Sequence, residues 1–306
     1  MPCSPPPRPA SRRLPHEWCG MATSMKGKTC VITGATSGIG REVAAILAAQ
    51  GARIIGVGRS TARCVEACTG IVSASGNQNV TFLVADLASQ AEIRGLANRI
   101  AHMTPRVDVL VNNAGTFTFK RKETVDGLET QFAVNWLSAF MLTGLLLPLL
   151  KGHGARVISL SSGSHFAGKI HWKDPGMRGG YHGLKAYDQS KLAMVLFTYE
   201  LARRLGTSAG VLCHAVDPGL VKTDIGFKAN GGLVRWVWRI RTRKGISPNE
   251  AARSVAFMAA DTSVGGKTAG YWKECRELES SHASHDSRDA ERLWALGEKL
   301  CGVSYP

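Results

Sequence analysis

The stretch KTCVITGATSGIGREVAAILAAQ, residues 28–50, decides the fold of this chain. A short apolar run enters a turn with glycines at Gly34, Gly38 and Gly40, and the turn opens into a helical pattern. Glycine lets the backbone approach a phosphate without a Cβ clash, and a helix N-terminus offers free N–H groups with a partial positive charge. A turn used only for packing is the alternative. The glycine turn lies between a buried strand and an amphipathic helix, and this position favours a dinucleotide pyrophosphate site.

Short apolar runs alternate with longer helical patterns along the chain, which predicts repeated βα units. The runs are apolar throughout, as strands covered on both faces are. The expected strands are 28–34, 52–58, 80–85, 107–112, 155–161 and 211–216, and the expected helices lie near 38–50, 88–103, 124–151 and 187–205. The predicted fold class is α/β, with a single doubly wound parallel sheet and helices on both faces.

Composition limits the classes of function. In 306 residues, 44% are hydrophobic and 20% are charged, which is typical of a globular domain. The net charge of +15 comes from scattered Lys and Arg without interleaved aromatics, which argues against a nucleic-acid partner. No Cys-x-x-Cys pair occurs, and His165 and His171 lack a third ligand at suitable spacing, so we expect no metal. The most apolar window, 140–150, is too short to span a bilayer and predicts an interior helix.

The N-terminal residues 1–24 are rich in Pro, Arg and Ser and lack the apolar core of a secretory signal. We expect a disordered tail or an over-extended start, since Met21 and Met25 offer later beginnings; a transit peptide is a weaker alternative. The folded domain is expected over 25–306, in the cytoplasm, with membrane association left open.

The end of the second strand predicts which nicotinamide cofactor is used. Enzymes that use NAD usually place an acid there for the ribose hydroxyls, whereas this strand ends Val57-Gly58-Arg59-Ser60. Arg59 can pair with a 2′-phosphate, which a carboxylate would repel. NADP(H) is therefore predicted, with an incidental surface arginine as the alternative. Asp86, after the third strand, is expected to cap a helix or face the adenine.

Tyr187 and Lys191 are four residues apart on a predicted helix, so their side chains share one face. A tyrosine with a pKa of about 10 is a poor base near neutrality. A neighbouring ammonium, together with the cationic oxidised nicotinamide, is expected to lower that pKa and make Tyr187 a general acid and base.

Tyr181 and Lys185 have the same spacing and compete for this role. The surrounding glycines Gly179, Gly180 and Gly183 disfavour a rigid helix there, so Tyr187 is preferred.

The motifs TGATSGIG, NNAG, VNWLSAF, SLSS, YDQSK and DPGLVKT occur in the order and rough spacing of the short-chain dehydrogenase/reductase family. The chain resembles that family over about residues 26–302. SSGSH, AYDQSKLAMVLFTYELARRL and LWALGEKLCG make it most similar to the retinol-dehydrogenase-like group. The resemblance implies a Rossmann fold and an oxidoreductase that interconverts an alcohol and an aldehyde or ketone.

The resemblance also assigns roles to single residues. It implies that Ser162, after the fifth strand, holds the substrate oxygen, with Ser164 as the fallback. It implies that Asn135 anchors a water that links Lys191 to solvent; a satisfied polar group between helices is the alternative. The catalytic set is then Asn135, Ser162, Tyr187 and Lys191. The expected cofactor residues are Gly34, Thr36, Ser37, Gly38, Ile39, Gly40, Arg59, Asp86, Leu87, Asn113, Ala114, Gly115, Tyr187, Lys191, Pro218, Gly219, Val221 and Thr223.

Two departures from the family pattern stand out. An insertion at 165–183 separates Ser162 from Tyr187 and is expected to shape the substrate entrance. Asp217 stands where the family usually has a histidine before Pro-Gly, which leaves the contacts near the nicotinamide carboxamide open.

A basic amphipathic segment lies between Ile225 and Asn249, where no acidic residue occurs. One face carries Leu233, Trp236, Val237 and Ile240, and the other carries Arg235, Arg239 and Arg243. We expect a substrate lid at about 225–245, and 233–243 is also a candidate for peripheral membrane contact. The expected substrate is a small lipophilic alcohol or carbonyl compound, similar to a retinoid, a steroid or a xenobiotic carbonyl. A non-catalytic NADP-binding or membrane-associated scaffold is the alternative, and a homodimer is left open.

Overall fold

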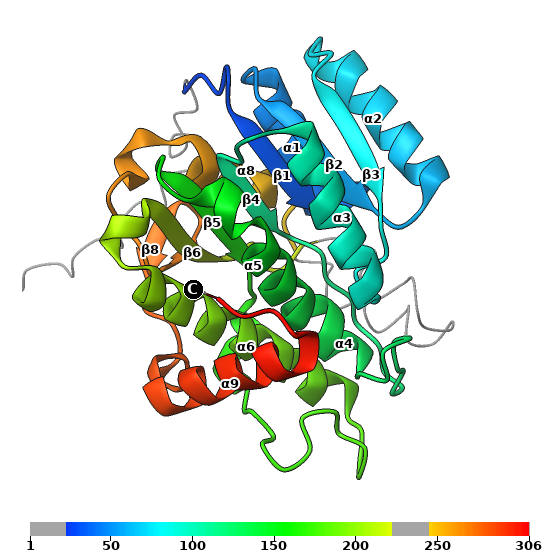
Figure 1. Ribbon diagram of the computed structural model, residues 1–306, viewed down its shortest axis with the longest axis vertical. Coiled ribbons are helices and arrows are strands. Elements are labelled where there is room, and N and C mark those ends of the chain that lie inside the picture. Colours follow the sequence, from blue (N-terminus) through cyan, green and yellow to red (C-terminus); the bar gives the residue numbers. More distant parts are fainter. Residues whose placement is uncertain (1–22, 222–244, 306) are drawn as a thin grey trace, which may run out of the picture.

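The computed structural model describes residues 23–221 and 245–305. An eight-stranded sheet with the order β3-β2-β1-β4-β5-β6-β7-β8 forms its centre (Figure 1). The strands are β1 (Thr29–Thr33), β2 (Arg53–Gly58), β3 (Val80–Val84), β4 (Val109–Asn112), β5 (Ala155–Leu160), β6 (Val211–Asp217), β7 (Gly270–Lys273) and β8 (Arg276–Leu278). All neighbours pair in parallel except β7 and β8. The predicted doubly wound α/β class is confirmed, with one antiparallel strand added at the edge.

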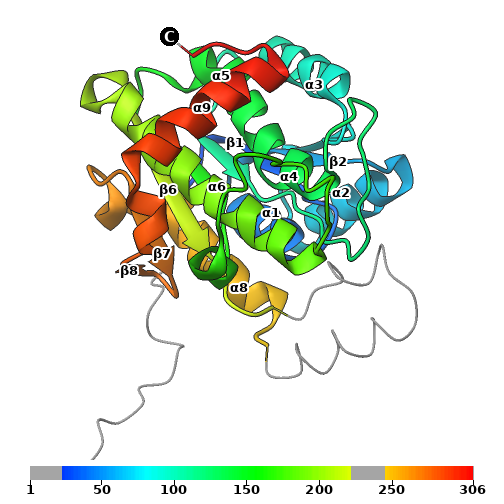
Figure 2. The same ribbon diagram turned by 90° about the horizontal axis from the view of Figure 1, so that it is seen from below.

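Helices cover both faces of the sheet. They are α1 (Gly38–Ala49), α2 (Thr61–Ser75), α3 (Gln90–Met103), α4 (Thr130–Phe132), α5 (Ser138–Leu150), α6 (Gly183–Leu205), α8 (Pro248–Ala260) and α9 (Ser287–Cys301). Side chains of β1 alternate between two apolar layers: Cys30 and Ile32 pack with α1 and α8, and Val31 packs with α3, α5 and α6. Helix α9 lies across α6 and α5, on the outer side of the second layer (Figure 2).

The predicted strands agree with the structure to within two residues, but the element list was incomplete. Helices α2, α8 and α9 and strands β7 and β8 were missed. Strand β7 has four residues, of which the first three are buried, and β8 has three that are all exposed, so neither is a long enough apolar run to predict a strand. The helix predicted at 124–151 begins only at Thr130 and contains a π-helical turn, Ala133–Leu137.

Helix α6 begins four residues before the predicted start, at Gly183, with His182 as its N-cap. The glycine that argued against a helix here has a packing reason. A Cβ on Gly183 would lie 2.4 Å from the carbonyl oxygen of Thr118, so only glycine permits this approach.

The segment Thr130–Leu150 is long and apolar enough to cross a membrane by length and composition alone. Inside the structure, however, 72% of its apolar window is buried. Phe140, Leu146 and Leu147 lie in the layer beneath α6 and α9. The segment 140–150 is therefore a core helix, as predicted.

Candidate active site

A cavity of about 530 Å³ lies at the C-terminal ends of β1, β2, β4, β5 and β6. It is lined by most of the expected residues: Gly34, Thr36, Ser37, Gly38, Ile39, Arg59, Asp86, Leu87, Asn113, Ala114, Gly115, Ser162, Tyr187, Lys191, Pro218, Gly219 and Val221. Gly40 and Asn135 lie behind its wall. Thr223, the segment 233–243 and nearly all of the expected lid at 225–245 lie outside the described residues.

The glycine turn between β1 and α1 brings backbone to one end of the cavity. Gly34 has a φ of +66°, a conformation that residues with a Cβ rarely adopt. A Cβ on Gly40 would lie 2.3 Å from Nδ2 of Asn113, which itself donates to the Thr33 carbonyl at 2.7 Å. Gly40 therefore serves close packing of α1 on the β4 end, and the cavity backbone comes from Gly38 and Ile39 instead.

The end of β2 is basic. Arg59 lines the cavity as predicted, and Ser60 and Arg63 from the start of α2 line it too. Arg63 was missed because α2 was not predicted; a helix starting after Ser60 would have placed it one turn beyond Arg59. A Cβ on Gly58 would lie 2.3 Å from Cγ2 of Thr36, so this position has no room for an acidic side chain.

Asp86 lines the same cavity, and its Oδ1 accepts a hydrogen bond from the backbone N–H of Ala88 at 3.0 Å. The carboxylate therefore holds the turn before α3 (Gln90–Met103). The N-cap of α3 is Ser89, whose hydroxyl accepts the Glu92 N–H at 3.3 Å, so the expectation that Asp86 caps this helix was wrong. That Asp86 faces the adenine stays a prediction.

Tyr187 and Lys191 lie one turn apart on α6 at the other end of the cavity. Lys191 Nζ donates to the Leu160 carbonyl at 2.9 Å and lies 5.6 Å from the Tyr187 ring centroid. Burial lowers the pKa of Lys191 to about 8, although the charge of Asp217 opposes that shift.

Lys191 together with the oxidised nicotinamide was expected to lower the pKa of Tyr187; among the chain's own groups, Lys191 is not one that lowers it. Burial raises this pKa, the charges of Asp217 and Asp188 raise it further, and only a hydrogen bond with the Ser162 side chain lowers it. The physical reason is that Lys191 and Tyr187 both lie in a water-poor site, where a carboxylate opposes the phenolate. The chain's own groups therefore favour the protonated phenol.

Three serines at the end of β5, Ser161, Ser162 and Ser164, line the cavity. The Ser161 hydroxyl donates to the Lys191 carbonyl at 3.0 Å, which ties β5 to α6. Ser162 is the N-cap of the 3-10 turn η3 (Gly163–Ala167), and its side chain is hydrogen-bonded with Tyr187. The bond to Tyr187 favours Ser162 over its neighbours, and its role stays a prediction.

Asn135 sits in the π-helical turn and is fully buried. Its Oδ1 accepts from the Thr116 N–H at 2.7 Å, and its Nδ2 donates to Ser190 Oγ at 2.9 Å. Ser190 Oγ in turn donates to the Tyr187 carbonyl at 2.7 Å. Asn135 thus supports the first turn of α6 from behind, and its link to a water stays a prediction.

The competing pair is separated by the structure. Lys185 lies in α6, but Tyr181 precedes that helix. The Tyr181 hydroxyl donates to Glu129 Oε1 at 3.0 Å, and Gln131 Nε2 donates to it at 2.6 Å. Tyr181 therefore anchors the 165–183 insertion on α4, away from the cavity lining.

Residues 23–221 and 245–305 contain no group of three or more His, Cys, Asp or Glu side chains arranged to hold a metal ion.

Comparison with known proteins gives the family. The short chain dehydrogenase profile matches residues 28–231. Retinol dehydrogenase 12 from Mus musculus is 35% identical over 288 residues, covering 94% of this chain and 90% of that protein. Polyprenol dehydrogenase from Mus musculus is 35% identical over 290 residues, covering 90% of this chain and 84% of that protein.

Two solved structures share the fold. An uncharacterized protein from Mycobacterium paratuberculosis is 30% identical, with a TM-score of 0.76 and coverage of 93% of this chain and 97% of that chain. The RhlG/NADP active-site complex from Pseudomonas aeruginosa is 26% identical, with a TM-score of 0.64 and coverage of 82% and 95%.

The chain therefore belongs to the short-chain dehydrogenase family of oxidoreductases, which use a nicotinamide cofactor. Within this family its similarity is to the retinol-dehydrogenase-like group, and the resemblance stated from the motifs is confirmed.

Proposed function

We propose that this chain is an NADP(H)-dependent oxidoreductase that interconverts an alcohol and an aldehyde or ketone on a lipophilic substrate. One observation carries the proposal: a single cavity joins the glycine turn and two arginines at one end to Tyr187, Lys191 and Ser162 at the other. Neither end alone would support it, because arginines at a glycine turn are found in binding proteins and a Tyr–Lys pair is found in ordinary helices.

The residues present fit NADP(H). Backbone N–H groups at Gly38 and Ile39 suit the pyrophosphate, and Arg59 and Arg63 suit a 2′-phosphate, where no side chain fits at Gly58. When bound, NADPH supplies a hydride to a carbonyl carbon, and NADP⁺ accepts one from an alcohol.

The proton steps follow from the chain's own groups. In reduction, the Tyr187 phenol donates its proton to the developing alkoxide while the Ser162 hydroxyl donates a hydrogen bond to the same oxygen. The Lys191 ammonium lies 5.6 Å from the tyrosine ring centroid and is the cation that we expect to stabilise the phenolate that remains. In oxidation the phenolate takes the hydroxyl proton, so this direction is expected to be faster at higher pH, because the pKa of Tyr187 is raised by burial.

A lipophilic substrate is supported by the apolar side chains around the pair. Val134, Leu160 and Leu184 line the cavity near Tyr187, and Phe117 stacks edge-on against the tyrosine ring at 5.7 Å. The similar mouse proteins named for retinol and polyprenol point to the same class of alcohol.

The test is NADPH consumption by the full chain over a panel of aldehydes, ketones, retinoids and steroids, with the alcohols and NADP⁺ run in reverse. Tyr187→Phe should lower turnover by about 10²–10⁴-fold and leave NADPH binding intact. Tyr181→Phe is the matched control and should retain turnover. Full turnover by Tyr187→Phe would sink the mechanism, and NADPH binding without turnover of any substrate would favour the scaffold alternative.

A further inference from the structure

Asp217 lies beside the proposed catalytic pair on the neighbouring strand. The register of β5 and β6 pairs Leu160 with Val216, and Asp217 is the next residue. Because the Lys191 ammonium is bonded to the Leu160 carbonyl, its charge and the Asp217 carboxylate lie at adjacent strand ends. A Cβ on Gly163 would lie 3.5 Å from Asp217 Oδ2, so no side chain separates that carboxylate from the turn that carries Ser162.

The carboxylate is held in one place. Its residue is 5% exposed, its Oδ1 accepts the Gly219 N–H at 2.9 Å, and the Tyr271 phenol donates to it. Lys273 Nζ lies 3.9 Å from Oδ2 and is partly exposed to solvent, so it screens the charge only weakly.

A buried histidine, His165, contacts the residues that surround this carboxylate. His165 Nε2 accepts the Ser281 N–H at 3.0 Å, so the ring proton is on Nδ1, which donates to the Ser162 carbonyl at 2.8 Å. The Tyr271 hydroxyl also lies 3.4 Å from that Nδ1. Burial lowers the pKa of His165, so the ring is neutral and Asp217 keeps its charge uncompensated from this side.

We propose that Asp217 is a positioning residue for the reaction, whose negative charge favours the protonated forms of Tyr187 and Lys191 and so extends to higher pH the range in which the pair can donate a proton. This inference rests on the proposed function for its meaning in catalysis. It adds a role for Asp217, which stands where the family usually has a histidine. A histidine could not supply this negative charge.

The direction of the effect follows from Coulomb's law. A negative charge favours the ammonium of Lys191 against the cost of burial, and it disfavours the phenolate of Tyr187. Asp188, on α6 itself, acts on Tyr187 in the same direction, whereas Asp217 acts on both members of the pair. The carboxylate therefore keeps both groups protonated to higher pH, which suits Tyr187 as a proton donor in carbonyl reduction.

The direct test measures Lys191 without requiring turnover. The full chain is labelled with acetic anhydride over a pH series, and acetylation of Lys191 is read by peptide mass spectrometry. Asp217→Asn preserves shape and removes the charge, so the midpoint for Lys191 should fall by roughly one pH unit. Asp217→His serves as a second variant should the first misfold, and should lower the midpoint similarly.

The matched control is Glu277→Gln, which removes one negative charge on β8, where the carboxylate pairs with Lys267 at 3.0 Å. It should leave the Lys191 midpoint unchanged. An unchanged midpoint in folded Asp217→Asn or Asp217→His would overturn the inference, as would an equal shift in Glu277→Gln.

The pH profile of turnover separates this inference from the proposed function. The profile for NADPH-dependent reduction should move to lower pH in Asp217→Asn, in the same direction as the labelling midpoint. A labelling shift in a chain that turns over no substrate supports the role of Asp217 and counts against the proposed function. Turnover in a chain whose Lys191 labelling midpoint does not move in Asp217→Asn supports the proposed function and counts against the role of Asp217.

Discussion

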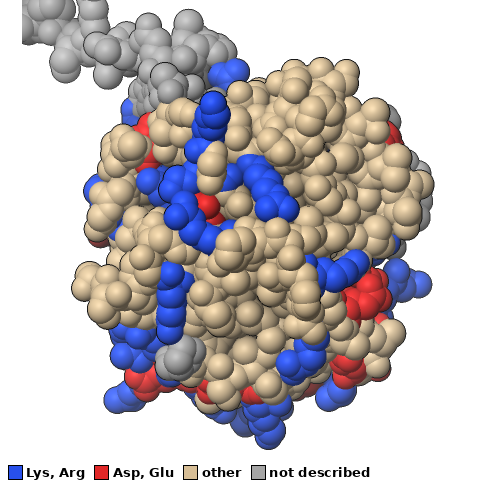
Figure 3. All heavy atoms as spheres, turned by 45° about the horizontal axis from the view of Figure 1, so that its top comes forward, with Lys and Arg blue, Asp and Glu red and all other residues tan. Residues whose placement is uncertain are grey.

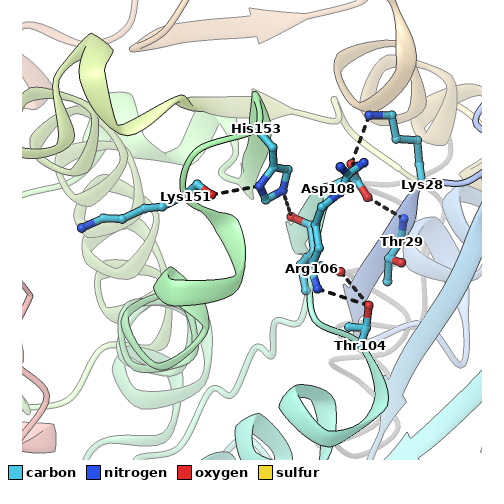
Figure 4. Close-up of polar contacts among 8 residues, drawn as sticks. Lys28, Thr29, Thr104, Arg106, Asp108, Lys151 and His153 are labelled. Carbon is cyan, nitrogen blue, oxygen red and sulfur yellow. Dashed lines mark hydrogen bonds and ion pairs between the residues drawn. The ribbon is translucent and has the colours of Figure 1, made fainter.

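Two buried aspartates at opposite edges of one sheet show how differently a carboxylate can be used. Asp108 precedes β4 at the N-terminal edge, where Lys28 Nζ lies 3.1 Å and Arg106 Nη2 2.6 Å from its Oδ1, and the Thr29 N–H donates to its Oδ2 at 2.9 Å (Figure 4). Asp217 ends β6 at the C-terminal edge, with a backbone N–H, a phenol and a partly exposed lysine 3.9 Å away around it.

The two aspartates differ in how far neighbouring cations and hydrogen-bond donors offset the negative charge. Burial raises the pKa of Asp108, but hydrogen bonds from Thr29, Arg106 and Lys28 outweigh it and lower that pKa overall. The face around this edge carries many Lys and Arg side chains (Figure 3). The charge of Asp108 is paired with cations that join β1 to β4, whereas that of Asp217 acts on Tyr187 and Lys191. A buried carboxylate thus stabilises the fold at one end of the strands, and we propose that it tunes the reacting groups at the other.

The largest effect that would break this comparison comes from Lys191→Met. We expect turnover to fall by about 10²–10⁴-fold, because the ammonium that stabilises the phenolate is lost. The free energy of unfolding at neutral pH should not fall, because burial disfavours the charged lysine. Steady-state kinetics and urea unfolding measure the two. A large loss of stability with unchanged turnover would make Lys191 a structural residue.

The next largest effect should separate the arginines at the two ends of the strands by their effect on cofactor binding. Arg59→Ala combined with Arg63→Ala should weaken NADPH binding by roughly 10–100-fold and leave NADH binding unchanged, since only NADPH carries the 2′-phosphate. Arg106→Ala makes the control at the N-terminal edge and should leave both affinities unchanged. Titration by calorimetry distinguishes the cases, and equal losses for NADPH and NADH would refute the phosphate assignment.

A smaller effect is expected from Asp108→Asn. The free energy of unfolding should fall by about 1–2 kcal/mol, limited by the exposure of Lys28 and Arg106. Turnover and its pH profile should be unchanged, unlike those of Asp217→Asn. Urea unfolding at neutral pH provides the measurement, and a shifted pH profile in this variant would erase the distinction between the two aspartates.

The smallest effect is a pH dependence of stability. The pKa of Asp108 is lowered in the folded chain, so its contribution is present above the unfolded value near 3.8 and is lost as the pH falls through the folded pKa. Acid unfolding should therefore show a component below about pH 4 that Asp108→Asn lacks. Identical acid profiles for the two proteins would contradict it.

Most of the candidate site could be predicted because its signals are local. The glycine turn, Arg59 after an apolar run, and the Tyr187–Lys191 spacing each fit within one βα connection or one helical turn. Ser162 needed the family resemblance, since four serines lie within residues 159–164. Arg63 and the role of Gly40 could not be predicted, because they depend on where α2 begins and on how α1 packs against Asn113.

Sequence by itself determined the doubly wound sheet, the family and most of the residues that meet at the cavity, because apolar periodicity and short motifs act over a few neighbouring positions. Tertiary structure alone decided which charges face the pair. Asp217, Tyr271 and His165 are separated by more than fifty residues each, and only the β5–β6–β7 pairing brings them to Ser162 and Lys191. Burial, which raises the pKa of Tyr187 and lowers that of Lys191, is likewise a property of the packed layers and of no single motif.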